Sequence, residues 1–221
     1  MTENRAVRRV RVPGSRPTTR PRHRPRRAFA GLVALLAALL AAAPGRAEDA
    51  AAPVERLHRA LLEAADTGET AQARYDHLLP VVSDVFDFQA MSRAAVGRVW
   101  SDFSDAERAA LIEHFAAYAT ANYARDFENA RNISFRTVEI EPGDGKRVRV
   151  ATELVRAKKG PISLDYLVFE GEQGAHIINV EVADTMNEFA RRRAEFRSLL
   201  DAGGLAHLLE TLEEQKRAIV R

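Results

Sequence analysis

The chain has 221 residues, enough for one domain or a small pair of domains. It contains 33 Lys and Arg and 31 Asp and Glu, but eleven of the Arg and a single acid, Glu3, lie in residues 1–47. Residues 48–221 therefore hold 22 basic and 30 acidic side chains, a formal charge of −8. Nucleic-acid binding requires a concentrated basic surface, so this balance argues against nucleic acid as a partner. The absence of cysteine excludes disulfides, thiol catalysis and thiolate metal sites.

The first 47 residues have the pattern of an export signal. A basic segment, Arg20 to Arg27, precedes sixteen residues, Ala28 to Ala43, made only of Ala, Leu, Val, Phe and Gly. Small residues then stand at positions −3 and −1 of a cut before Glu48. Sixteen residues are fewer than the roughly 20 that span a bilayer, and an uncleaved anchor is the alternative. We predict a signal peptide over residues 1–47, a periplasmic location and a single domain over residues 48–221; Arg26-Arg27 partly resembles a twin-arginine signal.

Helices are predicted from the start of the mature chain. A small-residue linker, residues 48–53, precedes an amphipathic helix over residues 54–65. Thr70 is predicted to cap the next helix, which Pro80 should kink or break. Asp87 is predicted to cap a third helix that ends near Gly97.

The clearest local signal opens the fourth predicted helix. Ser104 and Glu107 have the spacing of a capping box, and the helix is expected to run to about Asn129. After the strands, Thr185 should begin a final helical region that Gly203-Gly204 interrupts.

The stretch from Arg147 to Ala183 is predicted to form the floor of the fold. Three runs alternate between apolar and polar residues and are separated by turns, so each run reads as a strand with one apolar face. The apolar faces comprise Val148, Val150, Thr152 and Leu154; Ile162, Leu164, Tyr166 and Val168; and His176, Ile178, Val180 and Val182. A fourth strand begins at Ile133, with a bulge expected near Arg136-Thr137.

This grouping of elements predicts an α+β fold. It is a four-stranded, mostly antiparallel sheet whose apolar face is covered by N- and C-terminal helices. The cover either seals that face as a packed core or leaves a pocket for a ligand, and composition alone leaves both readings open.

No catalytic, cofactor or metal motif is present. The chain lacks a Gly-rich phosphate loop, GxSxG and HExxH, and its six histidines have no ligand spacing. His176 falls on a predicted apolar face, where a hydrogen-bonded core or pocket-rim histidine is the preferred reading. Arg191-Arg192-Arg193 is read as a solvated helix face, with contact to lipid phosphate or a partner as the alternative. We predict that the chain is not an enzyme.

Several segments resemble the MlaC/Ttg2D family, the periplasmic phospholipid-binding components of Mla-type ABC transport systems. The resemblance is carried by residues 85–100 (VFDFQAMSRAAVGRVW), by Phe103-Ser104 and by later short motifs in the family's order. These later motifs are residues 164–166 (LDY), 178–180 (INV), 193–196 (RAEF) and 203–205 (GGL). The family often has Trp where His176 stands, and the INV and RAEF motifs are closer to the hopanoid-associated HpnM branch.

The resemblance implies a carrier that shields lipid tails in a deep apolar pocket. The implied ligand is a phospholipid or a hopanoid-type lipid, and the implied partners are an inner-membrane MCE-type ABC transporter complex and an outer-membrane lipoprotein complex. A non-catalytic scaffold protein of a membrane-lipid assembly and, less favoured, an NTF2-like enzyme using His176 and Asp165 are the alternatives. The residues expected to line the pocket are Val85, Phe86, Met91, Phe115, Tyr123, Val150, Leu164, Tyr166, Ile178 and Phe196.

Overall fold

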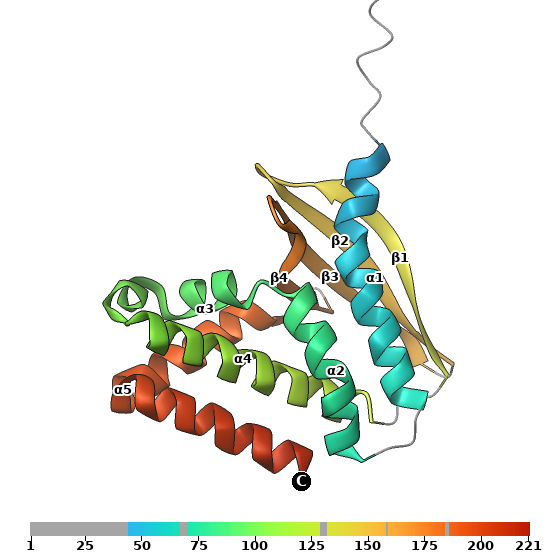
Figure 1. The fold of residues 1–221 in the computed structure, drawn as a ribbon. Helices are drawn as coiled ribbons and strands as arrows, with labels where there is room; N and C mark the ends of the chain where they lie inside the picture. Colours follow the sequence, from blue (N-terminus) through green and yellow to red (C-terminus); the bar gives the residue numbers. More distant parts are fainter. Residues whose placement is uncertain (1–43, 67–69, 129–131, 158, 184–185) are drawn as a thin grey trace, which may run out of the picture. The chain divides into compact units, whose positions relative to one another are not determined.

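The computed structural model describes residues 44–66, 70–128, 132–157, 159–183 and 186–221, so the predicted signal peptide before residue 44 and Thr185 lie outside the described residues. Long helices precede and follow an antiparallel sheet (Figure 1). The helices are α1 (Pro44–Asp66), α2 (Ala71–Val85), α3 (Phe88–Val96), the 3-10 helix η1 (Gly97–Asp102), α4 (Asp105–Asp126) and α5 (Glu188–Val220). The strands are β1 (Ile133–Pro142), β2 (Arg147–Arg156), β3 (Lys159–Gly171), β4 (Gly174–Val182) and β5 (Met186–Asn187).

The predicted helix starts are confirmed by their caps. The Thr70 hydroxyl accepts a hydrogen bond from the Ala73 amide at 3.2 Å, and the Asp87 carboxylate accepts one from the Ala90 amide at 2.8 Å. Ser104 and Glu107 form both bonds of the capping box. Each cap satisfies an amide that has no partner within its own helix.

Two expectations about prolines and small residues are wrong. The predicted linker over residues 48–53 is part of α1, because alanine favours helix and Ala50 is fully buried. Likewise α2 continues through Pro80 to Val85 without a break. Val82 and Val85, which follow the proline, are 0% and 1% exposed, so their packing holds the helix beyond it.

The sheet has four long antiparallel strands in the order β1-β2-β3-β4, with the short β5 added at the β4 edge. The predicted α+β class and four-stranded sheet are confirmed. β5 replaces the expected helical start, because Met186 pairs with Val182. The bulge expected in β1 is present, since the register shifts between Thr137 and Glu139.

A second register shift, in β4, overturns two face assignments. Leu167 pairs with Asn179, but the next residue, Val168, pairs with Ile177, so Ile178 is the extra residue. Ile177 is fully buried beside Val168, and His176 pairs with Phe169 on the opposite face. The expectation that His176 and Ile178 continue the apolar face is therefore wrong.

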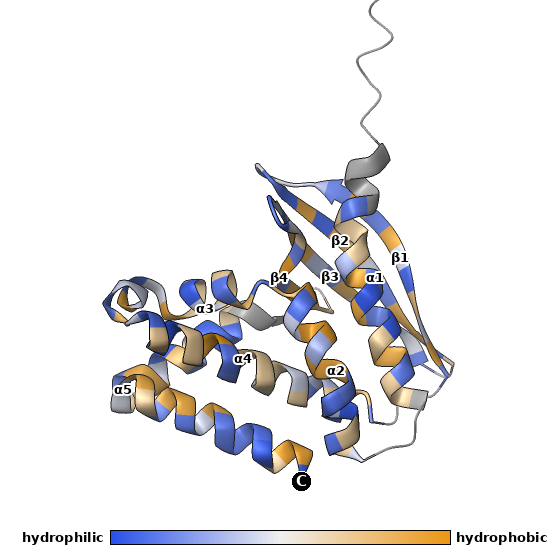
Figure 2. Cartoon of the chain, viewed as in Figure 1, coloured by the Kyte–Doolittle hydropathy of each residue, from blue (hydrophilic) through white to orange (hydrophobic). Residues whose placement is uncertain are grey.

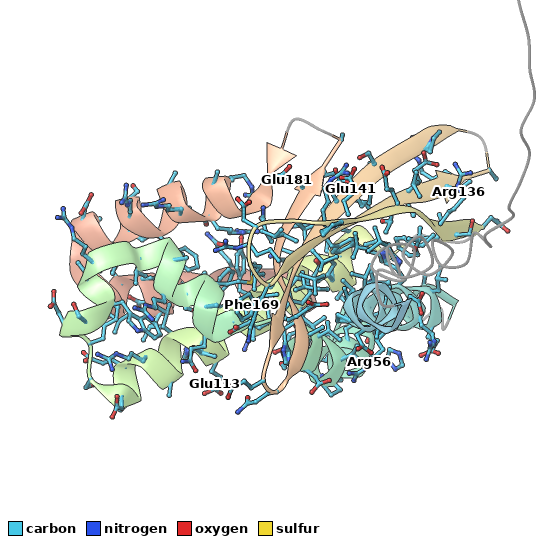
Figure 3. All side chains as sticks on the ribbon, turned by 90° about the horizontal axis from the view of Figure 1, so that it is seen from above. Arg56, Glu113, Arg136, Glu141, Phe169 and Glu181 are labelled. Atoms are coloured by element: carbon cyan, nitrogen blue, oxygen red, sulfur yellow. The ribbon has the colours of Figure 1, made fainter. Side chains whose placement is uncertain are left out.

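The helices cover one face of the sheet. Helix α1 contacts β1 to β4 and buries Val54, Leu57 and Leu61 (Figures 1 and 2). Helices α2 to α5 pack on one another beside it. On the other face, Arg149 forms ion pairs with Glu141 and Asp165, both at 2.7 Å. The labelled Arg136, Glu141 and Glu181 lie on this side, away from α1 (Figure 3).

Helix α5 consists of two helical segments separated at Gly203-Gly204, as predicted. Gly204 has φ +70°, a conformation that favours glycine, and a Cβ on Gly203 would lie 2.7 Å from the Cβ of His207. The bend lets Phe196, before it, and Leu208 and Leu212, after it, all be fully buried.

Candidate functional site

The helices do not fill all the space above the apolar face. A cavity of about 740 Å³ lies between the sheet and the helices, within the range of roughly 300–1,000 Å³ usual for ligand pockets. It is lined by residues of α1, α3, α4, α5 and all four long strands, together with Phe86 at the α2–α3 junction. The expected pocket is therefore present as a cavity, although no ligand defines its contents.

The walls of this cavity are mainly apolar. Leu164 and Tyr166 on β3 and Val180 and Val182 on β4 form part of the sheet side. The helix side is largely aromatic, and its rings touch in series. Phe86 lies 5.6 Å from Phe88 and 6.1 Å from Tyr123, and Tyr123 lies 6.4 Å from Phe127, as measured between ring centroids.

Six of the ten residues expected to line the pocket line this cavity: Phe86, Met91, Phe115, Tyr123, Leu164 and Tyr166. The other four do not. Val85, Val150 and Phe196 are at most 1% exposed and belong to the packed core. Ile178 is displaced by the β4 register shift. The lipid-contact role of each residue remains a prediction.

The sequence reasoning missed a buried polar pair beside the cavity. Nε2 of His58 on α1 lies 3.0 Å from the hydroxyl of Tyr166, and the His58 ring stacks on Phe135 at 3.8 Å. Burial lowers the pKa of His58 to about 4 and raises the pKa of Tyr166 well above its ordinary value. His58 falls one residue after Leu57 on the apolar stripe of α1, and that position was the available signal.

Charged side chains also line the cavity, and most of them are cationic: Arg125, Arg156, Lys159, Arg191, Arg192 and one acid, Asp126. Arg125 pairs with Asp126 at 2.8 Å. Arg192 donates to Glu195 at 2.9 Å and to the Tyr118 hydroxyl, and its guanidinium lies over the Tyr118 ring. Only the Arg191-Arg192 part of this set was singled out from the sequence.

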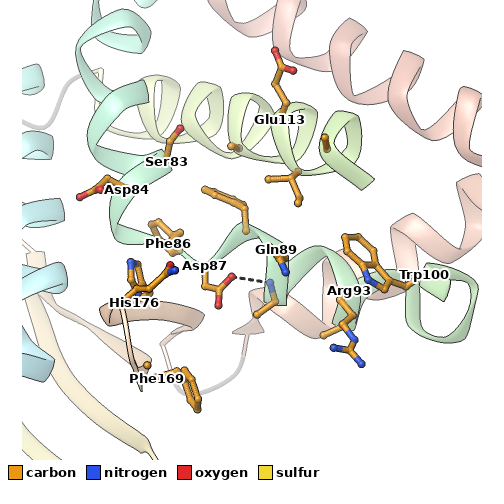
Figure 4. A pocket seen from close by; sticks show the side chains of 18 of the residues that line it. Ser83, Asp84, Phe86, Asp87, Gln89, Arg93, Trp100, Glu113, Phe169 and His176 are labelled. Atoms are coloured by element: carbon orange, nitrogen blue, oxygen red, sulfur yellow. Dashed lines mark hydrogen bonds between the residues drawn. The ribbon is translucent and has the colours of Figure 1, made fainter. Parts of the chain in front are cut away.

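A second, wider groove of about 1670 Å³ lies on the outside of α3 (Figure 4). Phe86 and Phe88 line both hollows and so form a wall between them. At one end of the groove, Phe86, Asp87 and His176 lie near one another, and Asp87 is occupied by its helix cap (Figure 4).

The geometry does not bring His176 and Asp165 together. The two residues lie on the same face of the sheet, contrary to expectation, because of the β4 register shift. However, Phe169, the partner of His176, is four residues along β3 from Asp165, which is roughly 13 Å. Asp165 instead accepts two bonds from Arg149. Among the described residues no cluster of His, Asp or Glu could hold a metal ion.

None of the described helices combines the length and hydropathy needed to cross a membrane. Comparison with curated protein sequences found no significant match. A solved structure of a phospholipid-binding protein from Ralstonia solanacearum, in complex with a phospholipid, is similar in fold. The two share 19% identity with a TM-score of 0.68, over 78% of this chain and 99% of that one. The sequence profile described as MlaC protein matches residues 54–214, well over half of the sequence, and on this evidence the chain belongs to the MlaC family.

Proposed function

We propose that this protein is a periplasmic lipid carrier that binds a phospholipid, or a hopanoid-type lipid, by its apolar tails. The observation that carries the proposal is the 740 Å³ cavity between the apolar face of the sheet and the aromatic wall of the helices. Membership of the MlaC family and the similar fold of a protein solved with a phospholipid both support it.

The physics of the cavity suits lipid tails. Moving a CH₂ group from an apolar site into water costs roughly 0.8 kcal/mol, so a carrier that crosses an aqueous compartment must supply an apolar site. Burial of tails is non-directional, and no catalytic group is required. A protein that served only as a scaffold would gain nothing from leaving this space unfilled.

The carrier is proposed to move between an inner-membrane MCE-type ABC transporter complex and an outer-membrane lipoprotein complex. The predicted export signal over residues 1–47 supports a periplasmic location. ATP hydrolysis is assigned to the transporter, because this chain has no Gly-rich phosphate loop.

Native mass spectrometry of the purified protein tests the proposal. We expect a bound phospholipid or hopanoid to be released on denaturation, and the delipidated protein to regain one from vesicles. A protein that carries no lipid when purified and takes none up from vesicles would contradict the carrier function.

A further inference from the structure

The apolar face of β2 ends in a cation. Side chains alternate along a strand, so Arg156 shares the face of Val150 and Leu154. The register agrees, because Arg156 pairs with Ile133 as Leu154 pairs with Phe135. Leu154, Arg156 and Ile133 all line the 740 Å³ cavity. The cavity wall therefore changes from hydrocarbon to positive charge at this end of the strand.

A second cation lies directly opposite the first. Lys159, the first residue of β3, pairs with Arg156 across the hairpin and also lines the cavity. Like charges directly opposite each other on neighbouring strands destabilise a sheet. Two positive charges at this position therefore require a compensating interaction.

Within the described part of the chain, no carboxylate supplies that interaction. Arg156 donates from Nη2 to the Gly160 carbonyl at 2.9 Å, and its Nε is buried with no hydrogen-bond partner. Lys159 forms no ion pair with a described residue. Arg125 and Arg192, by contrast, already have Asp126 and Glu195 as partners. A partly buried cation without a counter-ion is costly, and an anionic ligand would remove that cost.

We propose that the cavity selects lipids whose head group carries a phosphate, and that Arg156 and Lys159 hold that phosphate at the cavity mouth. This inference rests on the proposed carrier function. The order of the wall, apolar along β2 and cationic at Arg156, matches the order of tails and phosphate in a phospholipid. Arginine binds phosphate oxygens through two parallel N–H donors, and lysine adds a point charge. A lipid without phosphate, such as diacylglycerol or an unphosphorylated hopanoid, leaves both cations uncompensated.

Competition within one vesicle population tests this proposal. The delipidated full chain is incubated with phosphatidylcholine vesicles that contain equal amounts of phosphatidylglycerol and diacylglycerol with the same tails. Bound lipid is then measured by mass spectrometry. Because both lipids come from the same surface, attraction of the protein to the vesicle affects both equally. The variants are R156Q/K159Q and the matched control K146Q/R147Q, which removes two cations at the opposite end of β2 that do not line the cavity.

We expect the wild-type protein and K146Q/R147Q to favour phosphatidylglycerol by about tenfold, and R156Q/K159Q to take up both lipids with little preference. Equal uptake of the two lipids by the wild-type protein, or an equal loss of preference in the control, would overturn the head-group inference while leaving the carrier function intact. Uptake of neither lipid would instead count against the carrier function itself. A final titration with sn-glycerol 3-phosphate separates a lipid site from a free phosphate site. Binding of this tail-less anion as tight as that of the lipid would overturn the proposal.

Discussion

His58 on α1 and Tyr166 on β3, 108 positions apart in the sequence, form a hydrogen-bonded pair at 3.0 Å beneath the cavity. His58 also stacks on Phe135 of β1. The pair therefore ties the first helix to two strands of the sheet through a side chain that must remain neutral in the folded protein. This relationship leads to two predictions about stability.

Stability should fall as the pH is lowered from about 6.5 to 4. Burial lowers the pKa of His58 from 6.5 to about 4, so in this range the unfolded chain binds a proton that the folded protein excludes. The free energy of unfolding should decrease by about 3 kcal/mol across the range, at 1.36 kcal/mol per pKa unit. Urea unfolding of the wild-type protein and of His58→Gln at pH 7 and pH 4.5 measures the effect.

The control is His207→Gln, since His207 is exposed. The His58 variant should lose much of the wild-type pH dependence, and the His207 variant should keep it. The same pH dependence in all three proteins would contradict the assignment to His58.

Tyr166→Phe should lower stability while leaving lipid uptake almost unchanged. The substitution removes only the hydroxyl, so buried His58 loses its partner and the free energy of unfolding should fall by about 1–3 kcal/mol. The ring that lines the cavity is retained. Thermal unfolding and vesicle uptake measured on the same sample check both parts. Lost uptake in a stably folded variant would mean that the hydroxyl itself contacts the ligand.

A charge on the cavity wall should abolish lipid uptake. Leu164 lines the cavity, whereas Leu167, on the same strand, lies on the other face and pairs with Asn179. Leu164→Asp places a carboxylate against the tails, and Leu167→Asp is the matched control. Vesicle uptake should disappear only in the first variant, with folding verified by circular dichroism. Retained uptake in folded Leu164→Asp would place the lipid elsewhere.

Filling the cavity should reduce uptake without adding charge. Met91 on α3 lines the cavity, and Ala94, one turn later on the same helix, is exposed in the outer groove. Met91→Trp should lower lipid stoichiometry at least several-fold by occupying tail volume, and Ala94→Trp should not. Native mass spectrometry of the lipid-bound fraction measures both. The reverse result would identify the groove, rather than the cavity, as the lipid site.

The sequence by itself determined the features that depend on neighbours a few residues apart. Thr70, Asp87 and Ser104 cap helices because their side chains reach amides three residues later. The alternation along β2 and β3 identified their apolar faces, because strand side chains alternate with period 2. The apolar cover required for those faces followed from the same pattern, as did the α+β class.

Only the tertiary structure decided which apolar residues surround empty space. Val150 and Leu164 share one face of the sheet, yet the first is packed in the core and the second lines the cavity, because the helices above them differ. The β4 register shift moved His176 to the outer face, and it arises from pairing with β3 rather than from the β4 sequence. The His58–Tyr166 bond and the opposed Arg156 and Lys159 depend likewise on contacts between separate elements. Such contacts are set by packing across the whole chain, which local periodicity does not encode.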